Sequence, residues 1–112
     1  MNEKEETKTT FDGGISEEQI KQWKAKHRKV VRIDVVDDGE LHIGYFHRPT
    51  METMQAAAKV GKTDEVRSGQ VLFDGTWLGG SEFLRNDSVL FLATMQQLNK
   101  VFNSCMSSIK NL

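Results

Sequence analysis

The chain has 112 residues, of which 38% are apolar and 28% are charged, a composition typical of one globular domain. Fifteen lysines and arginines against sixteen aspartates and glutamates give a formal charge of −1, which excludes a globally basic nucleic-acid coat and an acidic solvating chain. The single cysteine, Cys105, excludes an internal disulfide framework and a cysteine-rich zinc site. No apolar run approaches the roughly 18 residues of a membrane span, and no hydrophobic segment marks the N-terminus for export, so we expect a protein of the reducing cytoplasm.

Residues 1–14 are rich in glutamate, lysine and threonine and contain one aromatic residue, Phe11. Such a segment buries too little apolar surface to offset its chain entropy, so we expect a disordered N-terminal tail. A partner could still hold this segment, with Phe11 as the anchor. A single α+β domain is then expected over residues 15–112.

The domain is expected to begin with a short helix over residues 17–27. Ser16 and Gln19 have the spacing of a capping box, which satisfies backbone groups at the start of a helix. Ile15 and Ile20 occupy the two positions of a hydrophobic staple, and the helical spacing of Ile20, Trp23 and His27 predicts one apolar edge on this helix.

Two segments rich in β-branched residues, 30–36 and 41–47, predict a β-hairpin. A two-residue turn would pair Val36 with Leu41, whereas a three-residue loop would pair Val36 with Glu40. Only the longer loop gathers the apolar residues on one face, so we expect that register. The apolar face would then carry Val31, Ile33, Val35, Leu41, Ile43 and Tyr45. The opposite, solvated face would carry Arg32, Asp34, Glu40, His42 and Phe46.

Two helices are expected after the hairpin. Thr50 is a good N-cap for the first, which Gly61 stops. Thr63 or Asp64 starts the second, whose apolar residues fall at helical spacing, and the glycines at 79–80 end it.

The last segment carries apolar residues at alternating spacings of four and three. After the N-cap Asp87 the repeat comprises Phe91, Met95, Leu98, Phe102, Cys105, Ile109 and Leu112. This pattern predicts a long C-terminal amphipathic helix with about three heptads of an apolar stripe. The stripe either packs on the sheet of its own domain or also meets another chain, and the pattern leaves both open. The residues expected to meet a partner are Met95, Leu98, Phe102 and Ile109.

The residue types that perform catalysis or bind metals form no constellation in the sequence. His27, His42 and His47 lack the spacing of a metal site and are expected to be structural or at the surface. Cys105 lies on the apolar stripe and is expected to be a buried thiol. Residues 75–81, GTWLGGS, lack the spacing and the lysine of a P-loop and fit a helix C-terminus with its tryptophan in the core. We therefore expect a non-enzymatic protein with no metal and no cofactor.

A cluster of basic residues lies within twelve positions: Lys21, Lys24, Lys26, Arg28, Lys29 and Arg32. Such a cluster can hold phosphate groups, or it can be a solvated surface balanced by the nearby glutamates. It has no interleaved aromatic residues on which a single strand would stack. Nucleic-acid binding is therefore an alternative and not the leading expectation.

Four segments, WKAKHRKV, YFHRP, WLGG and NDSVLFLA, occur in an order that resembles a group of small proteins encoded in the tail-gene region of tailed bacteriophages and prophages. The matching positions are Trp23, Lys24, His27, Tyr45, Phe46, Arg48, Pro49, Trp77, Leu78, Gly79, Gly80, Asp87 and Phe91. The similarity runs from Ser16 over nearly the whole domain. The chain departs from the group at Thr76, where cysteine would be expected, and in the C-terminal NSCMSSIKNL, which has no counterpart.

The chain is thus similar to tail assembly chaperones, and the resemblance implies that it keeps a tape-measure or tail-tube protein soluble until the tail is built. It implies a structural-assembly protein in the cytoplasm of a bacterial host, or in the virion, with no membrane partner. The alternatives are a virion component that forms a homo-oligomer through its last helix and a nucleic-acid-binding protein that uses the basic cluster. The expected fold is α+β: an N-terminal helix, an antiparallel β-hairpin and three helices, of which the last is longest. Adaptable methionine side chains on the helices would suit a partner-binding surface or fill gaps in the core: Met51, Met54, Met95 and Met106.

Overall fold

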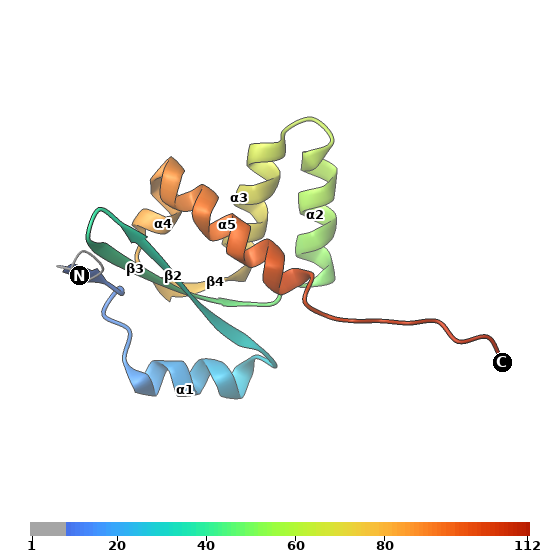
Figure 1. Cartoon of the computed structure of the whole chain (residues 1–112), viewed down its shortest axis with the longest axis horizontal. Coiled ribbons are helices and arrows are strands. Elements are labelled where there is room, and N and C mark those ends of the chain that lie inside the picture. The colour runs from blue at the N-terminus through green and yellow to red at the C-terminus, as the bar shows by residue number, and fades with distance from the viewer. Residues whose placement is uncertain (1–8) are drawn as a thin grey trace, which may run out of the picture.

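A computed structural model describes residues 9–112 of the chain (Figure 1). The elements in chain order are β1 (Thr9–Phe11), α1 (Glu17–Lys26), β2 (Val30–Asp37), β3 (Glu40–His47), α2 (Met51–Gly61), α3 (Glu65–Thr76), β4 (Trp77–Gly80), α4 (Phe83–Asn86) and α5 (Ser88–Phe102). Within this described part, five helices and one four-stranded sheet confirm the expected mixture of helix and sheet. None of its helices has the length and hydropathy needed to cross a bilayer.

Strand β3 is the centre of the sheet. It pairs with the antiparallel β2 along one edge. Its other edge is shared by two short strands, the parallel β1 and the antiparallel β4. Strand β2 therefore forms an edge of the sheet, and no strand of residues 9–112 pairs with its outer side.

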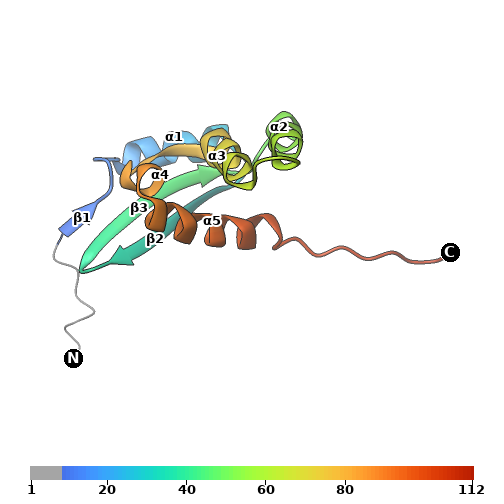
Figure 2. The same cartoon turned by 90° about the horizontal axis from the view of Figure 1, so that it is seen from above.

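Helices cover both faces of this sheet (Figures 1 and 2). Helices α3, α4 and α5 lie on one face, and α1 crosses the other. Helix α2 packs mainly against α3 and projects with it from the body as a helical hairpin. The core lies under α5 and consists of Ile33, Phe46, Phe73, Leu84, Leu90, Phe91, Met95 and Leu98.

The β-hairpin is confirmed, but its expected register is wrong. Val36 lies opposite Leu41, so the connection is a two-residue turn at Asp38 and Gly39. Both turn residues have positive φ, 52° at Asp38 and 80° at Gly39, as a type I′ turn requires. Aspartate tolerates this conformation better than most residues, which makes the shorter turn accessible.

The true register places His42 and Phe46 on the face of Ile33, where the core lies. Both residues were expected in solvent, and both are buried. The expectation failed because β3 is covered on its two faces. Helix α1 buries the second face, which carries Ile43 and Tyr45, so no wet face exists on this strand to fix the register.

The expected starts of the helices are confirmed by their caps. The side chain of Ser16 accepts a hydrogen bond from Gln19 N at 3.1 Å, and α1 follows it. Thr50 and Asp64 cap α2 and α3 in the same manner. Asp87 accepts from two backbone amides at the start of α5. These caps satisfy amides that have no partner inside the helix.

The expected end of the second helix after the hairpin is wrong. Helix α3 stops at Thr76, and residues 77–80 form the strand β4. Trp77 nevertheless lies against the core as expected, with its ring stacked on Phe73 at 5.2 Å and edge-on to Phe46 at 5.4 Å. Because the backbone at Trp77 is extended, residues 77–80 supply both a strand of the sheet and a ring of the core.

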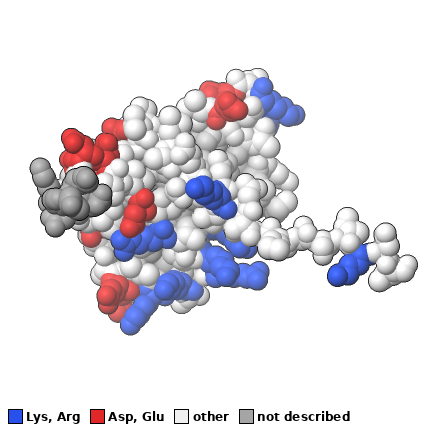
Figure 3. All heavy atoms as spheres, in the orientation of Figure 1, with Lys and Arg blue, Asp and Glu red and all other residues white. Residues whose placement is uncertain are grey.

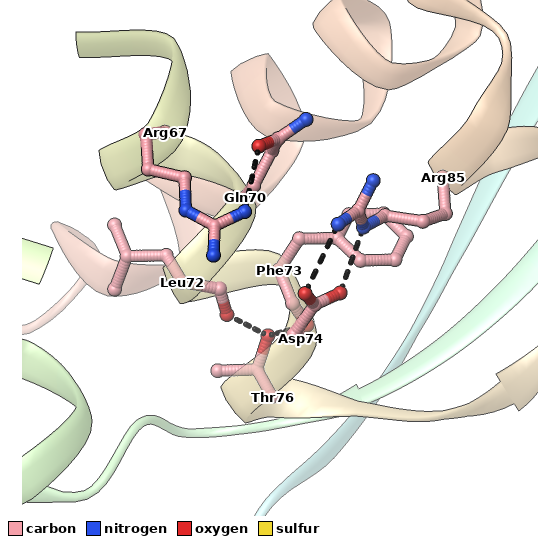
Figure 4. A network of polar contacts seen from close by, with 7 residues as sticks. All are labelled: Arg67, Gln70, Leu72, Phe73, Asp74, Thr76 and Arg85. Atoms are coloured by element: carbon pink, nitrogen blue, oxygen red, sulfur yellow. Dashed lines mark hydrogen bonds and ion pairs between the residues drawn. The ribbon is translucent and has the colours of Figure 1, made fainter. Parts of the chain in front are cut away.

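Helix α4, which the sequence pattern did not predict, is held to α3 by an ion pair (Figure 4). Arg85 Nε and Nη2 donate to the two carboxylate oxygens of Asp74 at 2.8 and 3.1 Å. The hydrogen bond to Asp74 raises the pKa of the Arg85 guanidinium. Nearby, Thr76 Oγ1 donates to Leu72 O at 2.8 Å, which satisfies a buried hydroxyl at the end of α3.

Regular structure begins earlier in the chain than expected, and the last helix also ends earlier than expected. Residues 9–14 were expected in a disordered tail, but Thr9–Phe11 form β1 beside β3 because Phe11 stacks on the buried ring of His42. The rest of that expected tail, residues 1–8, lies outside the described residues. Helix α5 ends at Phe102, not at the last residue, because the body of the domain ends there and offers nothing to cover a further turn.

Candidate partner-binding surface

The four residues expected to meet a partner fall in three different environments. Met95 and Leu98 are core residues with 8% and 0% of their surface exposed, so the prediction that they contact a partner is wrong. Phe102 is half-buried at the end of α5. Ile109 is 93% exposed and lies beyond the helix.

Residues 103–112, which we call the C-terminal segment, leave the body in an extended path (Figures 1 and 2). Asn103 and Ser104 still bond to the last turn of α5, and no regular element follows them. The side chains of Met106, Ile109 and Leu112 are almost wholly in solvent. Three large apolar side chains at spacings of three form one face if the segment becomes helical against a partner.

An apolar groove opens where the C-terminal segment begins. It has a volume of about 440 Å³ and is lined by Arg48, Pro49, Met54, Ala57, Ala58, Ser68, Leu72, Phe102 and Cys105. We call it the α2 groove. Its one serine is already bonded, because Ser68 Oγ donates to Ala57 O at 2.8 Å. The wall that remains for a partner is therefore chiefly apolar.

The α2 groove is open because α2 is covered on one side only. Gly75 of α3 leaves no space for a side chain and receives Thr53 of α2 at close range. This contact fixes the two helices together. The outer side of α2 still exposes Met51 and Met54, which are large and flexible.

Cys105 lines the α2 groove and is exposed, so the expectation of a buried thiol on a helical stripe is wrong. The stripe fails at this position because α5 has already ended. An exposed cysteine can form bonds between chains under oxidising conditions.

The six residues of the basic cluster are exposed, and basic side chains gather along the lower border of the molecule where α1 lies (Figure 3). Lys21, Lys24 and Lys26 lie on α1, and Arg28 and Lys29 lie between α1 and β2. Arg32 on β2 is not free, because its Nε donates to Asp34 Oδ1 at 2.7 Å, and this hydrogen bond raises the pKa of the guanidinium.

A second groove, of about 470 Å³, lies between β2 and α5. It is lined by Lys29, Val31, Arg32, Ile33, Asp34, Arg48, Gln97, Lys100, Val101 and Ser104. We call it the β2 groove. Arg48, a position of the tail-protein resemblance, borders both grooves.

The aromatic and glycine positions of the resemblance meet around β3 and β4. The Trp23 and Tyr45 rings lie 5.6 Å apart, which seats α1 on the sheet. A side chain at Gly79 would meet Trp23 at 3.0 Å, and Gly80 adopts a φ of 133° against Ile43. These residues hold α1, β3 and β4 together, and Pro49 forms the exit from β3 beside the α2 groove.

A buried polar network that sequence patterns missed joins β3 to the residue that follows β4. His42, 1% exposed, has its Nδ1 2.8 Å from Ser81 Oγ and its Nε2 3.2 Å from Glu40 Oε1. In the neutral ring, Nε2–H faces the carboxylate and donates to it, so Nδ1 accepts from the Ser81 hydroxyl. The correct register aims His42 at the core side, but its partner Ser81 lies 39 positions further along the chain, so sequence spacing does not reveal the pair.

The same three residue types form hydrolase triads, with the serine as nucleophile. Here Ser81 is 3% exposed, and the His42 ring is enclosed by Phe11 at 4.7 Å and Phe83 at 5.5 Å. The network ties β1 and β3 to the turn before α4. Its geometry supports a structural role, in which each buried polar group has a partner.

The other two histidines stack on each other at the end of α1. The rings of His27 and His47 lie 4.4 Å apart and nearly parallel, at 6°. Burial, and then the neighbouring charges of His47 and Lys26, lower the pKa of His27 from its usual value of 6.5. Among residues 9–112 no three metal-binding side chains come together.

Comparison of the chain with protein-family models, with curated proteins and with solved structures found no match. The surfaces described above therefore carry the functional argument.

Proposed function

We propose that the chain is a non-enzymatic assembly protein of a tailed bacteriophage or prophage, and that it binds a tape-measure or tail-tube protein as the tail assembly chaperones it resembles do. The observation that carries this proposal is the combination of an open apolar groove with an exposed apolar segment at its rim. Stable monomers rarely leave such features together unless a partner covers them.

The α2 groove suits an amphipathic helix of the partner. Ala57 and Ala58 are small and permit close approach of a helical backbone, and Met54 can adapt its shape to different side chains. A tape-measure protein is long, so a chaperone gains from a groove that accepts many similar helices. Met106, Ile109 and Leu112 would close over the bound helix from the C-terminal segment.

The sequence resemblance supports the same role from a different direction. Its aromatic and glycine positions build the body around β3, which is the part that a family would share. The C-terminal segment, which lacks a counterpart in the group, lies outside this body. This division fits a common scaffold with a variable partner-binding extension.

The test is co-expression of the chain with the tape-measure protein of the same phage, with the soluble fraction of the tape-measure protein as the readout. We expect the wild-type chain to raise this fraction severalfold. Ala58→Arg fills the groove and should abolish the effect, whereas Ala56→Arg, an exposed position on the same helix that does not line the groove, should not. No rise with the wild-type chain, or equal behaviour of the two variants, would contradict the proposal.

A second candidate function is nucleic-acid binding, favoured by the exposure of the whole basic cluster on α1 and the start of β2. It predicts a gel shift with duplex DNA that weakens steeply with salt, because each phosphate contact releases a counterion. Lys24→Glu should then weaken the shift at every sequence tested. A chain that causes no shift even at low salt would remove this candidate.

A further inference from the structure

Strand β2 leaves one edge of the sheet without a partner. Val31, Ile33 and Val35 lie opposite Phe46, Gly44 and His42 in the ladder with β3. The pair next to a two-residue turn exchanges hydrogen bonds, and this bonding alternates along an antiparallel ladder. The bonded residues of β2 are thus Asp37, Val35, Ile33 and Val31. The backbone groups of the alternate residues face away from β3: Val30, Arg32, Asp34 and Val36. Within residues 9–112 these four make no backbone hydrogen bond outside the ladder.

The sequence of this edge is symmetric about its centre in its valines and opposite in its charges. Residues 28–38 read RKVVRIDVVDD, and Ile33 is the central residue. Positions equally distant from the centre are either both valine or of opposite charge. The pairs are Arg28 with Asp38, Lys29 with Asp37, Val30 with Val36, Val31 with Val35, and Arg32 with Asp34.

We propose that β2 pairs with β2 of a second copy, antiparallel about a twofold axis at Ile33, so that two sheets become one. In this register Arg32 lies opposite Asp34 of the other copy, and the reverse pair forms by symmetry. Residues that face outward in one copy then meet residues that face outward in the other, as hydrogen bonding of a new ladder requires. Every charged position of the edge meets an opposite charge.

The surroundings of β2 leave room for this strand and favour it over other occupants. The β2 groove, of about 470 Å³, leaves open space between β2 and α5. Val36 is 61% exposed in one copy and would be covered beside Val30 of the other. An acidic peptide or a nucleic acid would suit Lys29 and Arg32 but would be repelled by Asp34 and Asp37, whereas a second copy satisfies both halves.

The edge lacks three of the features that keep edge strands apart, namely shortness, a proline and a bulge. Strand β2 has eight residues, contains no proline and has no bulge in its pairing with β3. Its ion pair, with Arg32 Nε 2.7 Å from Asp34 Oδ1, places both charges along one edge in advance. Pairing of two copies exchanges the two contacts within the chains for two contacts between them, so little new ordering of these side chains is needed.

The test is light scattering after size exclusion on the full chain, with a reducing agent because Cys105 is exposed. At about 0.1 mM chain, where even a micromolar complex is assembled, we expect twice the 12.7 kDa of one chain. Arg32→Asp and Asp34→Arg each place like charges opposite one another and should weaken the dimer at least about tenfold. An equimolar mixture of these two variants restores every pair and should return the dimeric mass.

A monomeric wild-type chain would overturn the proposal, as would single variants that stay dimeric or a mixture that stays monomeric. Circular dichroism checks that each variant is folded, and rescue in the mixture excludes misfolding as the cause of dissociation. This proposal does not depend on the proposed function. Ile109→Asp, which alters the C-terminal segment, should leave the dimer intact, and its dissociation would point to the other surface.

Discussion

The two halves of the apolar repeat in the last segment lie in different environments. Phe91, Met95 and Leu98 point into the core from α5, whereas Cys105, Ile109 and Leu112 carry the same spacing in an extended segment surrounded by solvent. The two halves share this spacing but differ in what lies beside them. The sheet and α4 cover the first half, and beyond Phe102 the body has ended. A periodic pattern thus indicates which side chains can share a face. Whether that face is buried depends on the rest of the fold.

The largest effect should come from a charge in the covered half. Leu98→Asp places an unpaired carboxylate at a position with no exposed surface, which should cost more than about 4 kcal/mol and unfold the chain. Leu92→Asp is the matched control, because Leu92 is exposed on the same helix and should change stability by less than about 0.5 kcal/mol. Circular dichroism distinguishes the two. Similar spectra and melting temperatures for both variants would contradict the burial of the first half.

A smaller loss is expected when an aromatic contact of the core is removed. Trp77→Ala takes away the ring stacked on Phe73 and edge-on to Phe46, at a cost of about 3 kcal/mol. For a chain of this size the melting temperature should fall by about 10 °C or more. An unchanged melting temperature would mean that this ring does not belong to the core.

The elements predicted correctly were those marked by local chemistry. The caps Ser16, Thr50, Asp64 and Asp87 start helices where expected, since a cap depends only on residues within one turn. The β-hairpin was found by its composition. Each of these signals is local, and none requires knowledge of the packing.

The errors share one cause, which is that distant contacts decide them. The hairpin register failed because α1 covers the second face of β3, which alternation alone does not reveal. Strand β4 exists because Gly79 and Gly80 let it approach β3 and Trp23 closely. The network of His42 and Ser81 joins residues 39 positions apart, so no sequence spacing announces it.

A modest effect should follow from acid pH at the end of α1. The pKa of His27 is lowered in the folded chain, chiefly by burial, so the unfolded chain binds its proton more readily. Stability is then fully present above pH 6.5 and falls as the pH drops below that value. Urea unfolding at pH 7.5 and 5.5 measures this change, and His27→Gln should reduce it. An equal loss in both proteins would assign the pH dependence to other groups.

The smallest effect on stability belongs to the uncovered half of the repeat. Ile109→Asp should change the free energy of unfolding by less than about 0.5 kcal/mol, because the side chain is 93% exposed. The same variant should weaken binding of the tape-measure protein in the co-expression assay. A large loss of stability would show that the C-terminal segment packs against its own domain.

Amide hydrogen exchange on the free wild-type chain tests the difference between the two halves most directly. Amides of residues 91–101 should exchange slowly, since they are bonded within α5 and lie over the core. Amides of residues 105–112 should exchange at the rate of an unstructured peptide. Protection of residues 105–112 comparable to that of residues 91–101 would contradict the exposed C-terminal segment, and with it the surface on which the proposed function rests.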